Sequence, residues 1–156
     1  MRDRDAERAA VTAEAGAQTF AATFDAVVET AAFVAEFCKR HGVDGSDALR
    51  VTLVIEELFL NIVMHGYGGE GEGTVRLALA LEETYVVVVC EDRAPAYDPR
   101  PAFERVPADL DDPVEARGVG GLGQFLVGQL VSAAHYERAG DANRLTLRIG
   151  RTRGLG

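Results

Sequence analysis

Three polar side chains recur at helical spacing inside an apolar stretch of this chain of 156 residues. Val51–Met64 reads VTLVIEELFLNIVM, and Glu57, Asn61 and His65 follow one another at every fourth residue. Residues four apart share one side of an α-helix. A carboxylate can take a proton from a hydroxyl or water, and an amide oxygen can ligate Mg²⁺. The stripe indicates a polar cavity, and a solvated helix edge with a structural histidine is the alternative.

A second candidate is the acid that follows the valine-rich run Tyr85–Cys90. Asp92 comes just after this run, which is typical of a central strand covered on both faces. Ligand sites of α/β folds cluster beyond strand ends. A carboxylate at such a place can accept a hydrogen bond from an exocyclic amine, such as that of adenine. A strand-terminating turn residue is the alternative interpretation.

A glycine-rich run, Arg117-Gly118-Val119-Gly120-Gly121-Leu122-Gly123, opens a predicted helix. Backbone amides at a helix N-terminus form an anion site when no side chain shields them. The run spells GxGxxG, but a proline-rich acidic loop precedes it where a dinucleotide fold requires a strand. The sequence also lacks GxxxxGK[ST], which excludes a Walker-type loop. An anion site and a flexible hinge remain as interpretations of the run.

The elements that must position these residues alternate between helix and strand. We predict strands at Gln18–Phe24, Thr74–Leu81, Tyr85–Cys90, His135–Arg138 and Arg144–Ile149, and helices at Asp25–His41, Ser46–His65 and Leu122–Ser132. Gly42 and an Ser46 N-cap mark two helix boundaries. All five prolines lie between Pro95 and Pro113, which favours a long loop without helix. The order predicts an α/β (α+β) two-layer sandwich, with a mixed, mostly antiparallel sheet and helices on one face.

Composition narrows the class of protein further. The chain has 25 acidic and 16 basic residues, a net charge of −9, which argues against nucleic-acid binding but not against an anionic ligand. Cys38 and Cys90 sit in apolar runs and are expected to be buried thiols. No signal peptide or membrane span is apparent, so we expect a cytoplasmic protein. We expect one domain at 17–150, flanked by tails at 1–16 and 151–156.

Together these motifs resemble the GHKL ATPases and, more narrowly, the stand-alone serine-protein kinases that act as anti-sigma factors in bacterial partner-switching systems. The resemblance covers roughly Gln18 to Ile149. It rests on the order and spacing of Glu57-Leu-Phe-Leu-Asn61-Ile-Val-Met-His65-Gly-Tyr, Asp92-Arg-Ala-Pro-Ala-Tyr-Asp98-Pro, Gly118-Val-Gly-Gly-Leu-Gly123 and Asn143-Arg-Leu-Thr-Leu.

The resemblance implies a role for each matching residue. Glu57 is then the general base, Asn61 the Mg²⁺ ligand and Asp92 the reader of the adenine amine. The implied ATP-binding residues are Asn61, Asp92, Ala96, Arg117, Gly118, Val119, Gly120, Gly121, Leu122 and Gly123, and segment 93–117 corresponds to the ATP lid. Ala94 departs from the family, which usually has glycine there. Gly128 and Ser132 stand where relatives often have a basic residue and an acid.

The resemblance implies an ATP- and Mg²⁺-dependent serine-protein kinase that regulates a small anti-anti-sigma (STAS-type) protein, as a homodimer that also binds a sigma factor. The alternative is a catalytically weak ATP-binding module that sequesters a sigma factor or partners a phosphatase. A sensor histidine kinase is disfavoured, because we expect no phosphoacceptor helix pair before Gln18.

Overall fold

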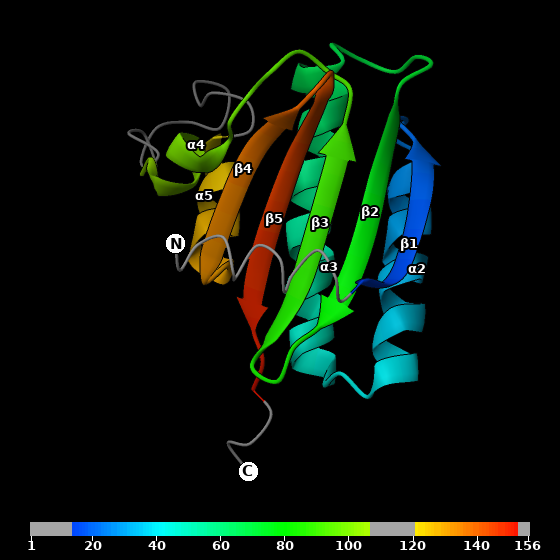
Figure 1. Cartoon of the computed structure of the whole chain (residues 1–156), viewed down its shortest axis with the longest axis vertical. Coiled ribbons are helices and arrows are strands. Elements are labelled where there is room, and N and C mark those ends of the chain that lie inside the picture. The colour runs from blue at the N-terminus through cyan, green and yellow to red at the C-terminus, as the bar shows by residue number, and fades with distance from the viewer. Residues whose placement is uncertain (1–13, 107–120, 153–156) are drawn as a thin grey trace.

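The computed structural model describes residues 14–106 and 121–152 of the chain. In chain order its elements are β1 (Glu14–Ala21), α2 (Ala26–His41), α3 (Gly45–Asn61), the π-helical turn η1 (Ile62–Gly66), β2 (Thr74–Leu81), β3 (Tyr85–Asp92), α4 (Arg100–Glu104), α5 (Gly121–Leu130), β4 (Ala133–Ala139) and β5 (Ala142–Gly150). The strands form one sheet of order β1-β2-β3-β5-β4 (Figure 1). All four pairings between these strands are antiparallel. The predicted two-layer α+β fold is confirmed, without the parallel pair that a mixed sheet would contain.

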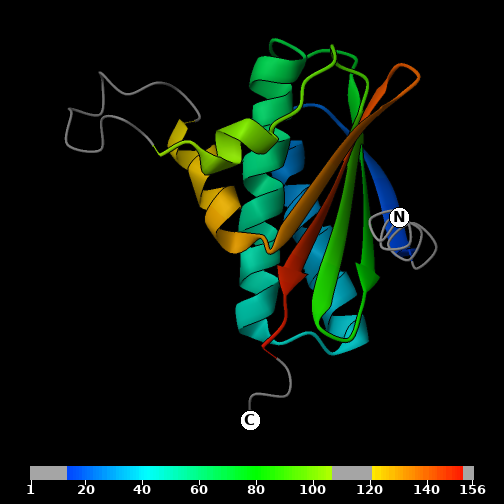
Figure 2. The same ribbon diagram turned by 60° about the vertical axis from the view of Figure 1, so that its left-hand side comes forward.

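The helices lie on one face of the sheet (Figure 2). Alternation along β2 turns Val75, Leu77 and Leu79 into the main core, as predicted from the period of two. The intervening Ala78 and Ala80 form a second buried cluster with Val87 and Val89 of β3. Strand β3 is therefore the middle strand and is buried on both faces, which explains its continuous apolar run.

The helix boundaries agree with the sequence at one place and differ at another. Helix α2 ends at Gly42, whose φ of 67° is the left-handed conformation that glycine favours. The predicted N-cap Ser46 is wrong, because the backbone carbonyl of Asp44 already accepts the first helical bond from the Ala48 N–H at 2.8 Å. Ser46 therefore lies within the first turn of α3.

Two further boundaries need correction. Strand β1 starts at Glu14, inside the expected tail, and ends at Ala21, so Phe24 follows the strand. Helix α4 forms inside the proline-rich interval that was expected to be a loop. Its Pro101 sits in the first turn, where a missing N–H breaks no helical bond. The rest of the expected lid, 107–120, lies outside the described residues, as do 1–13 and 153–156.

Cys38 and Cys90 are both buried and free, as predicted. Within the described segments, no helix is long and apolar enough to cross a membrane.

Candidate functional site

The end of β3 places Asp92 in a buried position at one end of a cavity. The residue is only 8% exposed. Oδ1 accepts hydrogen bonds from the Ala94 backbone N–H and from Asn143 Nδ2, both at 2.9 Å. Both bonds fall on one oxygen, so within the described structure Oδ2 is the carboxylate oxygen left for a ligand. The fixed Oδ1 sets the orientation of the whole carboxylate.

Asn143 organises this end of the site, although the sequence marked it only as the start of a strand. It pairs with Asp92 across the β3–β5 ladder. Its Nδ2 donates to Asp92 and to the backbone carbonyls of Ala94 and Pro95, at 2.9, 3.2 and 3.1 Å. Its Oδ1 accepts from the Tyr97 N–H at 3.2 Å and the Tyr136 hydroxyl at 2.6 Å. One buried amide therefore holds both Asp92 and the segment that follows it.

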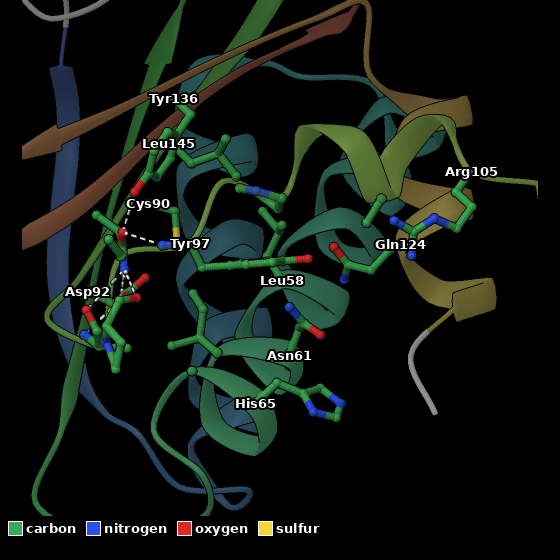
Figure 3. Close-up of a pocket in the computed structure, with 18 of the residues that line it drawn as sticks. Leu58, Asn61, His65, Cys90, Asp92, Tyr97, Arg105, Gln124, Tyr136 and Leu145 are labelled. Carbon is green, nitrogen blue, oxygen red and sulfur yellow. Dashed lines mark hydrogen bonds between the residues drawn. The ribbon is translucent and has the colours of Figure 1, made fainter. Parts of the chain in front are cut away.

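The cavity has a volume of about 560 Å³ and extends from Asp92 to the start of α5 (Figure 3). Its apolar walls include Leu58, Cys90, Ala94, Ala96, Tyr136 and Leu145. Burial, followed by the charges of Asp92 and Glu91, raises the pKa of the Cys90 thiol, so this wall residue stays neutral. An apolar slot with one oriented carboxylate at its end suits a flat heteroaromatic ring that carries an amine.

Ala94, the departure from the family pattern, is 2% exposed and lines the cavity. A Cβ at Gly66 would lie only 3.2 Å from the Ala94 methyl group, so the missing side chain at residue 66 makes room for that methyl. The two residues together shape the floor of the cavity.

The predicted polar stripe divides at the end of α3. Asn61 is the last residue of α3, and Asn61 and His65 both line the cavity. His65 belongs to the π-helical turn η1 that follows Asn61, in which the Tyr67 N–H donates to the Ile62 carbonyl at 2.8 Å. Such turns widen the helical step and often lie at functional sites. His65 is exposed, whereas Asn61 is half-buried.

Glu57 does not line the cavity but faces α5. A Cβ at Gly123 would overlap its carboxylate, so the glycine is what permits this approach. Burial, and then the neighbouring Glu56 carboxylate, raises the pKa of Glu57 above its ordinary value. The structure thus brings together one residue of the stripe and one of the glycine run, which are far apart in the sequence.

The glycine run is described only in part. Gly121, Leu122 and Gly123 form the first turn of α5, and Gly121 lines the cavity. Arg117, Gly118, Val119 and Gly120 lie outside the described residues. The described part places the start of α5 at the end of the cavity away from Asp92, and backbone amides at such a helix N-terminus can bind an anion.

Sequence reasoning missed several residues of this site. Tyr97 and Arg105 line the cavity, and so does the buried Gln124 of α5. Of these residues, only Tyr97 could have been predicted from the sequence. It lies five residues after Asp92, and an aromatic residue near an acid that reads adenine is a candidate wall of the site.

The structure is an α+β sandwich with a cavity between the end of β3 and the start of α5, and comparison with known proteins identifies its class. The sequence profile of the histidine kinase-like ATPase domain matches residues 20–149. The chain therefore belongs to the histidine kinase-like ATPase domain family, and the expected GHKL membership is confirmed. Membership in an ATPase family implies ATP binding. Comparison with curated protein sequences finds no significant match.

Two solved structures share the fold. The RsbU and RsbW domains of Rv1364c from Mycobacterium tuberculosis match with a TM-score of 0.56 and 22% identity, over 87% of this chain and 33% of that one. The SiaB–SiaC complex from Pseudomonas aeruginosa matches with a TM-score of 0.59 and 18% identity, over 95% of this chain and 96% of that one. The chain thus spans about a third of the first structure and nearly all of the second.

Proposed function

We propose that the chain is an ATP- and Mg²⁺-dependent serine-protein kinase that acts as an anti-sigma factor and regulates a small anti-anti-sigma protein. The observation that carries the proposal is the contact between Glu57 and Gly123. It sets a carboxylate of raised pKa beside the helix N-terminus that would bind the phosphates. A base near the transferred phosphoryl group is what protein phosphorylation requires and what passive ATP binding does not.

In the proposed site each residue has one task. Asp92 accepts a hydrogen bond from the adenine amine through Oδ2, and the apolar walls, Ala96 among them, contact the ring. The amides of the glycine run, with Arg117 at its start, bind the phosphate oxygens. Glu57 takes the hydroxyl proton of the partner's serine. The serine Oγ then bonds to the γ-phosphorus, while the bond between the γ-phosphorus and the β-phosphate oxygen breaks and ADP leaves.

Asn61 is the residue that would hold Mg²⁺. No group of three or more His, Cys, Asp and Glu side chains that could hold a metal occurs in the described segments. The single amide oxygen of Asn61 fits Mg²⁺, because this ion retains waters and binds nucleotide phosphates with one or two protein oxygens. Bound there, Mg²⁺ would supply positive charge to the phosphates, including the leaving ADP.

The test is incubation of the full chain with labelled ATP and candidate anti-anti-sigma proteins from the same genome. We expect label on a serine of one of them. Glu57→Gln should lower transfer by about 10²–10⁴-fold with little change in ATP affinity. Glu56→Gln is the matched control, because Glu56 is the adjacent carboxylate on the same helix. If both variants transfer phosphate at the wild-type rate, Glu57 is not the base.

One observation favours a second function, an ATP-gated binding module with little catalysis. Glu57 lies outside the cavity lining, against α5. Under this alternative the chain still binds its partner, a sigma factor or a phosphatase, in an ATP-dependent manner. The same assay separates the two: ATP-dependent capture of the partner without any labelled serine supports the module. The homodimer stays a prediction, which sedimentation of the purified chain can test.

A further inference from the structure

Gln124, at the edge of the proposed nucleotide site, has a buried amide oxygen that finds no hydrogen-bond partner among the described residues. It follows Gly123 directly in the first turn of α5 and is 5% exposed. Its Oε1 is fully buried, and no donor within the described structure reaches it. The side chain lines the cavity and extends into it from α5 (Figure 3).

The other buried amide of the site, that of Asn143, is fully hydrogen-bonded, so the unpaired Oε1 of Gln124 is unusual here. Asn143 uses both ends of its amide, with donors on Oδ1 and acceptors for Nδ2. A buried amide oxygen that lacks a donor destabilises the fold, because it has lost its bond to water and gained none. Leucine would fill the position on α5 without this loss, so Gln124 is better explained by a ligand group than by packing.

We propose, on the basis of the nucleotide site proposed above, that Gln124 hydrogen-bonds a ribose hydroxyl of the bound nucleotide. Phosphate oxygens only accept hydrogen bonds, so they would pair with Nε2 and leave Oε1 unpaired. The adenine amine is assigned to Asp92. A hydroxyl both donates and accepts, so it pairs with the amide whichever way the carboxamide is turned.

The position of Gln124 agrees with the order of groups in a nucleotide. Asp92 lies on the sheet side of the cavity, and Gln124 faces it from α5 (Figure 3). Gln124 also adjoins Gly123, at the helix N-terminus where the phosphates are proposed to bind. The ribose joins the base to the phosphates, so it is the part of the ligand that passes between these two ends. Gln124 then makes the site selective for ribonucleotides over deoxyribonucleotides.

The experiment is calorimetry of the full chain with Mg²⁺ and either ATP, 2′-deoxy-ATP or 3′-deoxy-ATP. In the wild type we expect one deoxy analogue to bind about 5- to 100-fold more weakly than ATP, the range for leaving one buried partner unpaired. Gln124→Leu should bind ATP more weakly by a similar factor and should bind the analogue and ATP equally, within about twofold. Gln129→Leu is the matched control, since Gln129 is exposed on the same helix and outside this cavity.

Thermal unfolding of the nucleotide-free protein gives an independent readout. Gln124→Leu removes the unpaired amide, so its midpoint should equal or exceed that of the wild type although its ATP affinity falls. Two results overturn the assignment: a wild type that does not distinguish the three nucleotides, or a Gln124→Leu variant that distinguishes them as the wild type does. A wild type that binds none of the three refutes the nucleotide site itself, which separates that failure from the failure of the ribose contact.

Discussion

The Glu57 carboxylate lies against Gly123 so closely that a side chain at residue 123 would overlap it. Alanine usually stabilises a helix relative to glycine, by about 1 kcal/mol. In Gly123→Ala the new methyl group would displace the flexible end of the Glu57 side chain, so the change acts on the position of the proposed base and not on the packing of α5. We expect phosphoryl transfer to fall by at least about tenfold, the effect of roughly 1.4 kcal/mol on the barrier.

Gly121→Ala is the control for that variant. Among the described residues nothing lies within 4 Å of the position that the Gly121 Cβ would take, and Gly121 shares the first turn of α5. Transfer to the partner protein, measured with labelled ATP, should be retained far better in Gly121→Ala than in Gly123→Ala. Equal loss in both would mean that the glycine run acts through backbone flexibility and not through its contact with Glu57.

The raised pKa of Glu57 predicts a pH dependence of stability. Burial, and secondarily Glu56, raises the folded-state pKa above the unfolded value, which is about 4.3 for glutamate. Glu57 then contributes its full stability below the unfolded pKa, and this contribution is lost as pH rises through the folded pKa. Glu57→Gln should therefore unfold at a higher temperature than the wild type at neutral pH. The difference should vanish near pH 4 in a series of thermal melts, and a constant difference at all pH values would exclude the titration of Glu57 as its cause.

Asp92 and Asn143 predict how the site selects its base. If Asp92 Oδ2 accepts the adenine amine, GTP should bind far more weakly than ATP, because guanine presents a carbonyl at that position. Asp92→Asn should weaken ATP binding by several-fold or more. Asn143→Ala should also weaken it, since it releases Asp92 Oδ1 and the Tyr97 N–H from their bonds. Calorimetry with ATP and GTP checks these expectations, and equal affinities for the two nucleotides in the wild type would contradict the assignment.

The sequence predicted the elements of this fold well, because hydrophobic periodicity is a local property. Strand β2 follows from the alternation of its apolar residues, and the C-terminal end of α2 follows from Gly42. The helical spacing of Glu57 and Asn61 likewise placed both on α3. What the sequence could not give is pairing across the sheet. Asn143 matters because of its register opposite Asp92, and no local pattern encodes that register.

Other differences have similarly physical reasons. The π-helical turn Ile62–Gly66 begins only after Asn61, and its wider step, with the Tyr67 N–H bonded to the Ile62 carbonyl, interrupts the regular helical spacing before His65. Helix α4 was missed because prolines are read as helix breakers, although the first turn tolerates them. The role of Gln124 could not be predicted from the sequence for another reason. It is inferred from a buried oxygen that lacks a hydrogen bond among the described residues, and only the structure shows this.

Gly128, which the sequence comparison noted only as a departure from related kinases, has a structural reason. A Cβ at this position would overlap the backbone carbonyl of Phe103, so the glycine lets α4 pack directly on α5. A backbone atom cannot move aside as a flexible side chain can. Gly128→Ala should therefore destabilise the protein by about 1–3 kcal/mol, the usual cost of overpacking, despite the higher helix propensity of alanine.

Thermal melts and limited trypsin digestion together test this packing. Gly45→Ala is the control, because Gly45 also lies in a helix and no atom of the described residues comes within 4 Å of its Cβ position. Loosening α4 should speed cleavage after Arg105, which lines the cavity, whereas Arg100 is followed by Pro101 and is a poor trypsin site. Mg-ATP should slow cleavage after Arg105 in the wild type, because a nucleotide in the cavity shields that residue, and it should slow it less in Gly128→Ala. If Gly128→Ala melts and is cleaved as Gly45→Ala is, then α4 does not depend on close packing against α5, and the connection between nucleotide binding and this segment must be sought elsewhere.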